Sequence, residues 1–125
     1  MGLILFPGDD DLSSPDVEWS YSGFAAFRRQ LAAAEGFELA EMWGFGGDRP
    51  WSEVTTPLAV FLDRPDDHGG EMTPVECAAL LPRLEAISGQ WQHDPEVPRE
   101  HVRGIRQLAV VMHLCVAKDV ELLFL

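Results

Sequence analysis

The sequence predicts an α+β fold that is mainly helical, with about three main helices and a small antiparallel sheet formed by the chain termini. Apolar residues recur at helical spacing in segments 23–35, 74–89 and 99–118. Short apolar runs at 2–6 and 120–125 pair most simply with each other. The length of 125 residues suits a single domain, 1–125.

The N-terminal segment 2–6 predicts a short buried strand that ends at Pro7-Gly8. A polar loop over 9–16 follows it. Trp19 and Tyr21 then alternate about a serine, which indicates a second short strand.

The first helix is expected at 23–35, with Ser22 as its N-cap. Gly36 suits the left-handed position after the helix, and Phe37 can pack back on the last turn. The helical spacing is carried by Phe24, Phe27, Leu31 and Ala34.

The middle of the chain predicts short elements and loops. Residues 38–42 suggest one helical turn, and 44–50 suggest a glycine-rich loop. The apolar run 57–62 fits either a helical turn or a short strand. Residues 63–70 form a polar loop.

The second main helix has three start signals, with Thr73 as N-cap, Pro74 at the first helical position and Glu76 completing a capping box. Pro82 is expected to kink or divide this helix, because it lacks the N–H for a helical hydrogen bond. Gly89 is the expected stop. The apolar stripe consists of Cys77, Leu80, Leu81, Leu84, Ile87 and Trp91.

The longest helix is predicted at 99–118. Val110, Val111 and Leu114 widen its apolar face, so we expect it to be central, while Gly104 weakens its first turns. The rest of the expected buried face is Val102, Ile105, Leu108, Ala109, Met112, Cys115 and Val116.

The charge is strongly negative, with 21 Asp and Glu against 9 Lys and Arg, for a net charge of −12. Such a surface repels nucleic-acid phosphate and anionic membranes. It attracts a basic partner and speeds the encounter with it. The alternative is that the charge only maintains solubility.

The N-terminus lacks a basic segment followed by a long apolar one, and no apolar run approaches the roughly 20 residues of a membrane span. We therefore expect a reducing, cytoplasmic setting. Cys77 and Cys115 are expected as free, buried thiols, with a disulfide between them as the alternative.

The acidic loop 63–76 is a candidate cation site. An EF-hand-like register places Asp67, Glu71 and Glu76 at ligand positions, but Pro65 and Gly69 replace two expected ligands. The alternative is a solvated turn in which Glu76 only caps a helix. The candidate ligands are Asp66, Asp67, Glu71 and Glu76.

The run Gly44-Phe45-Gly46-Gly47 lacks the lysine of a phosphate-binding loop, and Asp48 would repel phosphate. It predicts a glycine turn anchored by Phe45. The neighbouring rings of Trp43, Phe45 and Trp51 are candidates for an interaction surface, with core packing as the alternative.

The histidines and cysteines show no metal-ligand spacing, and His113 and Cys115 lie on different faces of one helix. Cys77 is a poor candidate nucleophile, because the neighbouring carboxylate of Glu76 raises the pKa of its thiol. The sequence therefore indicates no catalytic residue.

Three stretches, 19–24, 44–47 and 70–77, resemble a set of short uncharacterised proteins of high-GC actinobacteria. The resemblance covers roughly residues 19–84. The acidic loop of those proteins has more aspartates and a cysteine before the glycine, where this chain has Asp67, His68 and Gly69. The resemblance implies a cytoplasmic protein and carries over no activity.

These observations favour a non-enzymatic acidic interaction module that binds a protein partner, similar in size and charge to small inhibitor, immunity and accessory proteins. The partner is expected to be basic, with no cofactor, and a homo-oligomer stays open. The alternative is a small-molecule or divalent-cation binder that uses the 63–76 loop near Trp43 and Trp51. An enzyme whose site the sequence does not show is a third hypothesis.

Overall fold

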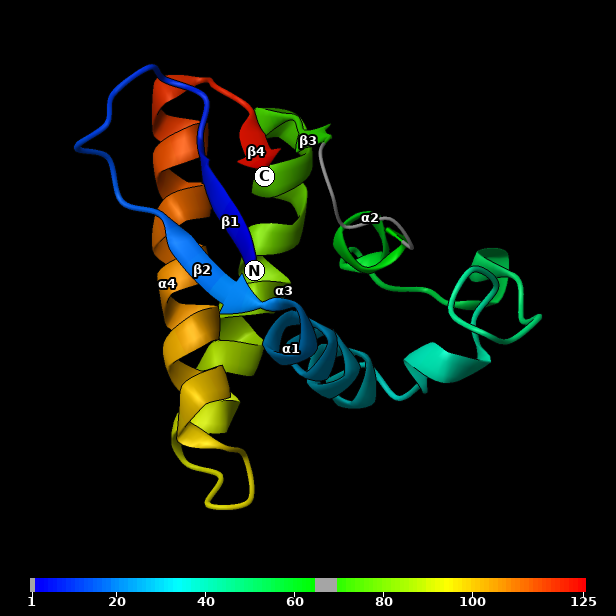
Figure 1. Cartoon of the computed structure of the whole chain (residues 1–125). Coiled ribbons are helices and arrows are strands. Elements are labelled where there is room, and N and C mark those ends of the chain that lie inside the picture. Colours follow the sequence, from blue (N-terminus) through cyan, green and yellow to red (C-terminus); the bar gives the residue numbers. More distant parts are fainter. Residues whose placement is uncertain (1, 65–69) are drawn as a thin grey trace.

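The computed structural model describes residues 2–64 and 70–125, and in these ranges the fold is α+β and mainly helical, as predicted (Figure 1). The three long helices enclose one contiguous hydrophobic core together with a four-stranded sheet. The elements are β1 (Gly2–Pro7), β2 (Val17–Ser20), α1 (Tyr21–Ala34), η1 (Leu39–Glu41), η2 (Trp51–Glu53), α2 (Ala59–Leu62), β3 (Glu71–Met72), α3 (Pro74–Gln92), α4 (Arg99–Lys118) and β4 (Leu122–Phe124).

The chain termini form the centre of the sheet, which confirms the predicted pairing. The strand order is β2-β1-β4-β3, and all neighbours are antiparallel. Leu5 lies opposite Phe124 in the central pair. The two-residue strand β3, which pairs with β4, was not predicted from the sequence.

The predicted short strand is present as β1, and one of its faces is buried. Leu3 and Leu5 are buried, whereas the side chain of Ile4 between them is 37% exposed. Successive strand residues point to opposite faces, and α4 contacts β1, β2 and β4. In Figure 1 the helices α3 and α4 lie behind the sheet, and the other face is turned to the viewer.

Helix α1 begins two residues earlier than expected. Its N-cap is Ser20 and not Ser22, because the Oγ of Ser20 accepts a hydrogen bond from the backbone N–H of Gly23 at 3.0 Å. Its end follows the prediction, since Gly36 has a φ of 84° and the N–H of Phe37 donates to the carbonyl of Ala32 at 3.1 Å.

The capping box of α3 is confirmed. The N–H of Glu76 donates to Thr73 Oγ1 at 3.1 Å, and the N–H of Thr73 donates to Glu76 Oε1 at 2.9 Å. The predicted apolar stripe of this helix is buried throughout.

Neither Pro82 nor Gly89 ends α3, which contradicts the expected stop at Gly89. Both residues lie on the exposed side of the helix. The carbonyl that Pro82 leaves unbonded can therefore meet water, and the buried side of the helix holds it together. The helix ends at Gln92, where Arg99 Nη2 donates to the carbonyls of Trp91 at 3.3 Å and Asp94 at 2.7 Å.

Helix α4 has the predicted bounds and is central, because it packs on α3 and on the sheet. The prediction that Val110 widens the buried face is wrong, since its side chain is 50% exposed; Val116 is exposed as well. Gly104 has a packing role. A Cβ at this position would lie 3.2 Å from Nε1 of Trp19, so the glycine makes room for the indole ring.

Two short segments in the middle of the chain are helical. Residues 59–62 form a helical turn, α2, rather than a strand, and the turn expected at 38–42 is the 3-10 helix η1.

The polar loop 9–16 is held to α4 by Lys118, whose Nζ lies 2.8 Å from Asp9 Oδ2. This hydrogen bond holds the pKa of Asp9 well below its usual range. No helix in the described residues is both long and apolar enough to cross a membrane.

His101, at the start of α4, is buried among aromatic rings and generates a prediction about pH. Its ring centroid lies 6.0 Å from that of Phe27 and 6.4 Å from that of Trp91. Burial lowers the pKa of His101 below its usual value near 6.5. The unfolded chain therefore binds more protons at this residue over the interval between the two pKa values.

We expect the free energy of unfolding to fall as the pH drops from about 6.5 through the lower pKa of folded His101. His101→Gln should remove this part of the pH dependence, and His93→Gln, a change at an exposed histidine, should leave it intact. Urea denaturation between about pH 4.5 and pH 7.5 measures both. Parallel pH profiles of wild type and His101→Gln would contradict the prediction.

Candidate functional site

The predicted interaction residues Trp43, Phe45 and Trp51 all lie in one segment, residues 37–58, which we call the acidic lobe. The Trp51 ring packs edge-on against Phe37, with centroids 5.9 Å apart, and against Phe45 at 6.0 Å. Its Nε1 donates to the backbone carbonyl of Trp43 at 3.0 Å. Trp51 therefore organises the lobe from within.

The glycine run forms the turn of this lobe, in agreement with the structural interpretation of the sequence. Gly44 and Gly46 have φ values of 91° and 103°, which favour glycine. A Cβ at Gly47 would lie 2.1 Å from the backbone oxygen of Glu41. The three glycines are thus required by the backbone path.

Trp43 presents its ring to solvent. Of the four tryptophans, all within the described residues, it is the exposed one, with 65% of its surface accessible. Phe45 is half-buried, with the guanidinium of Arg28 5.1 Å from its ring centroid. The three predicted rings therefore lie in one segment, where Trp43 is exposed and Phe45 and Trp51 pack within the lobe.

The acidic lobe carries four carboxylates against one arginine. Arg49 pairs with Glu53 at 3.4 Å, a partly exposed ion pair of small energetic value. The other three carboxylates are exposed and have no ion-pair partner among the described residues; they are Glu38, Glu41 and Asp48. Trp43 thus lies in a locally negative segment.

The lobe is attached to the helical body through Glu35 at the end of α1. Its carboxylate lies 2.6 Å from Arg83 of α3 and accepts a hydrogen bond from Thr56 Oγ1. The Glu35 side chain is only 7% exposed, so these contacts are partly shielded from water. Trp43 is consequently held on an anchored segment.

The candidate cation ligands are only partly placed. Asp66 and Asp67 lie outside the described residues. Glu71 is exposed on β3, and the carboxylate of Glu76 accepts the N–H of Thr73 in the capping box. Within 2–64 and 70–125 no three His, Cys, Asp or Glu side chains are grouped to hold a metal ion. The cation hypothesis stays a prediction.

Cys77 and Cys115 are free, buried and hydrogen-bonded to each other, so the alternative of a disulfide does not hold in this structure. The Cys115 thiol donates onward to the carbonyl of Glu121 at 3.7 Å. The hydrogen bond to Cys115, then burial, raises the pKa of the Cys77 thiol, and the charge of Glu76 acts in the same direction. A thiol of this kind is a poor nucleophile at neutral pH.

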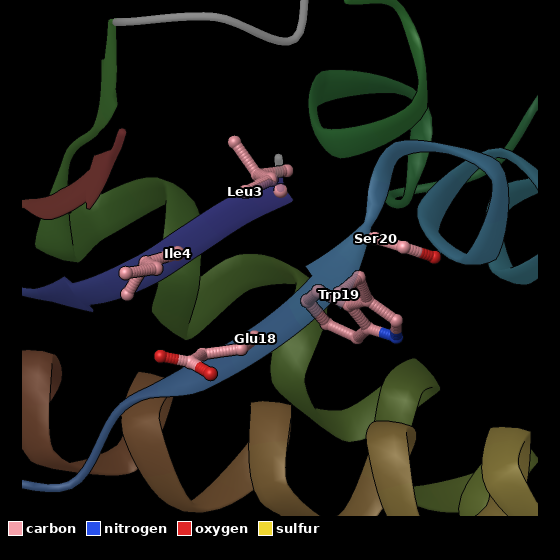
Figure 2. Close-up of a pocket in the computed structure, with 6 residues that line it drawn as sticks. Leu3, Ile4, Glu18, Trp19 and Ser20 are labelled. Carbon is pink, nitrogen blue, oxygen red and sulfur yellow. The ribbon is translucent and has the colours of Figure 1, made fainter.

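Sequence reasoning missed the surface around β2. An open depression of about 460 Å³ is lined by β1 and β2 residues, and Figure 2 shows Ile4, Glu18 and Trp19 around it. A second, of about 610 Å³, runs between β2 and α4. Only a faint sequence signal could have indicated this surface. It consists of Gly23 and Gly104, which leave space on either side of Trp19.

The chain matches no protein-family model, no curated protein and no solved structure.

Gly47→Ala tests the construction of the acidic lobe. The new Cβ would collide with the backbone of Glu41, so we expect a loss of about 2 kcal/mol or more in the free energy of unfolding, together with faster proteolysis in 37–58. The matched control is Gly89→Ala in α3, where a Cβ meets nothing within 4 Å and should stabilise the helix by about 0.5–1 kcal/mol. Equal effects of the two changes in thermal unfolding would contradict the prediction.

Proposed function

We propose that this chain is a non-enzymatic interaction module that binds a basic protein partner, with the exposed ring of Trp43 at the centre of the contact. The observation that carries the proposal is the 65% exposure of Trp43 on an anchored, acidic segment. Large exposed aromatic rings are costly in water and are enriched among the residues that dominate binding energy.

The construction of the lobe supports this role. The Trp51 N–H···O=C bond to Trp43 and the three glycines fix the backbone that carries the indole ring. A ring held in this way loses little conformational freedom when a partner covers it, so less binding energy is lost to ordering.

Charge supports the choice of a basic partner. The net charge is −12, and the exposed carboxylates Glu38, Glu41 and Asp48 lie in the segment that carries Trp43. A negative field steers a cationic surface toward the lobe and raises the association rate at low salt. Small inhibitor, immunity and accessory proteins have a similar size and charge, which supports the proposal by analogy only.

Affinity capture with the whole protein as bait tests the proposal, at about 50 mM and about 500 mM salt. We expect a basic protein to be retained at the lower salt and released at the higher. Trp43→Ala should weaken its binding by about thirtyfold, the effect of losing a central aromatic residue. Leu12→Ala is the matched control, because Leu12 is a fully exposed apolar side chain in the 9–16 loop, and should change the affinity less than about twofold.

Two results would count against the proposal. One is the recovery of no salt-sensitive protein by wild-type bait. The other is equal affinity of wild type and Trp43→Ala for the captured protein, which would place the contact elsewhere.

A further inference from the structure

The outer edge of β2 has backbone groups that the sheet leaves unpaired. The N–H and C=O of Ile4 bond to Leu125 of the C-terminal segment, at 2.8 and 2.9 Å. Ile4 therefore cannot also bond to Glu18, which lies opposite it on β2. The N–H and C=O of Glu18 consequently point away from β1, and the N–H of Ser20 does the same.

A groove lies along this edge. It has a volume of about 610 Å³ between β2 and the first half of α4, with Glu18 and Trp19 on one wall and Arg103 and Gln107 on the other. The indole of Trp19 lies over Gly104, whose missing side chain keeps the groove open. An added strand lies about 4.8 Å beside the edge strand, on the side where this groove runs.

One end of the groove is closed. Gln107 Nε2 donates to the backbone carbonyl of Asp16 at 2.9 Å, so this side chain occupies the hydrogen-bonding position just before Glu18. At the other end the chain turns into α1 at Tyr21. The open stretch therefore consists of the backbone of residues 18–20, with a defined start and finish.

We propose that the β2 edge accepts an extended peptide segment of a protein partner as an additional antiparallel strand, with a basic side chain opposite Glu18. One residue of the added strand would then satisfy both backbone groups of Glu18, as in other cases of strand addition. The neighbouring side chains of the added strand would point toward Trp19 and Gly104, where small apolar residues fit.

Charge selects this occupant over a second copy of the chain. Three carboxylates line the groove against one arginine; they are Asp16, Glu18 and Glu100, against Arg103. A lysine or arginine opposite Glu18 forms a favourable cross-strand pair. Pairing of β2 with β2 of a second copy would bring like carboxylates together between two chains of net charge −12.

This site is separate from the acidic lobe, because none of its lining residues belongs to segment 37–58. Experiments can therefore test peptide binding at the β2 edge independently of partner binding at Trp43. Trp43→Ala should leave binding at the β2 edge unchanged.

The test uses a capped heptapeptide of alternating valine and lysine as the probe, followed by amide NMR and hydrogen exchange on the whole protein. We expect the probe to shift the amide of Glu18 and to slow its exchange. Glu18→Pro removes the outward N–H, which the sheet itself does not use, and edge strands tolerate proline in this orientation. It should weaken probe binding at least about tenfold.

Glu18→Ala is the matched control, because it removes the same carboxylate but keeps the N–H, and it should weaken binding only about threefold. A probe with N-methylated backbone groups tests the same hydrogen bonds from the peptide side and applies even if Glu18→Pro fails to fold. It should bind at least about tenfold more weakly than the parent peptide.

Several outcomes would overturn the proposal. These are equal probe binding by Glu18→Pro and Glu18→Ala, equal binding of the N-methylated peptide, or amide shifts confined to the acidic lobe. A dimer in sedimentation experiments that Glu18→Pro abolishes, without probe binding, would assign the edge to a second copy instead.

Discussion

The packing of α4 against α3 on one side and the sheet on the other is the constraint on which the rest of the structure depends. Its buried stripe, which includes Ile105, Leu108 and Met112, forms the middle of the core. Because α4 lies against one face of a short sheet, the opposite face stays partly exposed. The edge of β2 stays accessible for a related reason, since the chain passes from β2 directly into α1 and never returns along that edge.

The elements that the sequence predicted well are those whose signals are local. The capping box of α3, the bounds of α4 and the apolar runs at both termini each depend on a few neighbouring residues. The errors concern helix ends that are set by contacts with other parts of the structure. Ser20 and Ser22 are both acceptable caps, and Ser20 is used because pairing with Gly2 extends β2 up to that residue. Gly89 does not end α3, because its buried neighbours continue to pack for another turn.

The acidic lobe and the β2 edge also differ in how far local sequence signals could predict them. The grouping of Trp43, Phe45 and Trp51 follows from their closeness in sequence around a glycine turn, so it could be predicted. Which ring faces water could not be predicted, because it depends on the hydrogen bond from Trp51 to the backbone of Trp43 and on the packing of Trp51 against Phe37. The β2 edge was beyond prediction for a stronger reason. Its open backbone groups are defined by the register of β1 with the C-terminus, about 120 residues away along the chain.

The way the fold uses its few cations leaves carboxylates exposed and unpaired on a surface that its composition already makes acidic. Arg99 and Arg64 donate to backbone carbonyls, at the end of α3 and beside β3, and in these bonds they neutralise no carboxylate. Arg83 and Lys118 pair with carboxylates whose side chains are largely covered, Glu35 and Asp9. These four cations thus stabilise the fold. Among the described residues, the exposed carboxylates of Glu18, Glu38, Glu41 and Asp48 have no ion-pair partner. A cationic partner therefore has few ion pairs to displace at either surface, and mainly the removal of water opposes its approach.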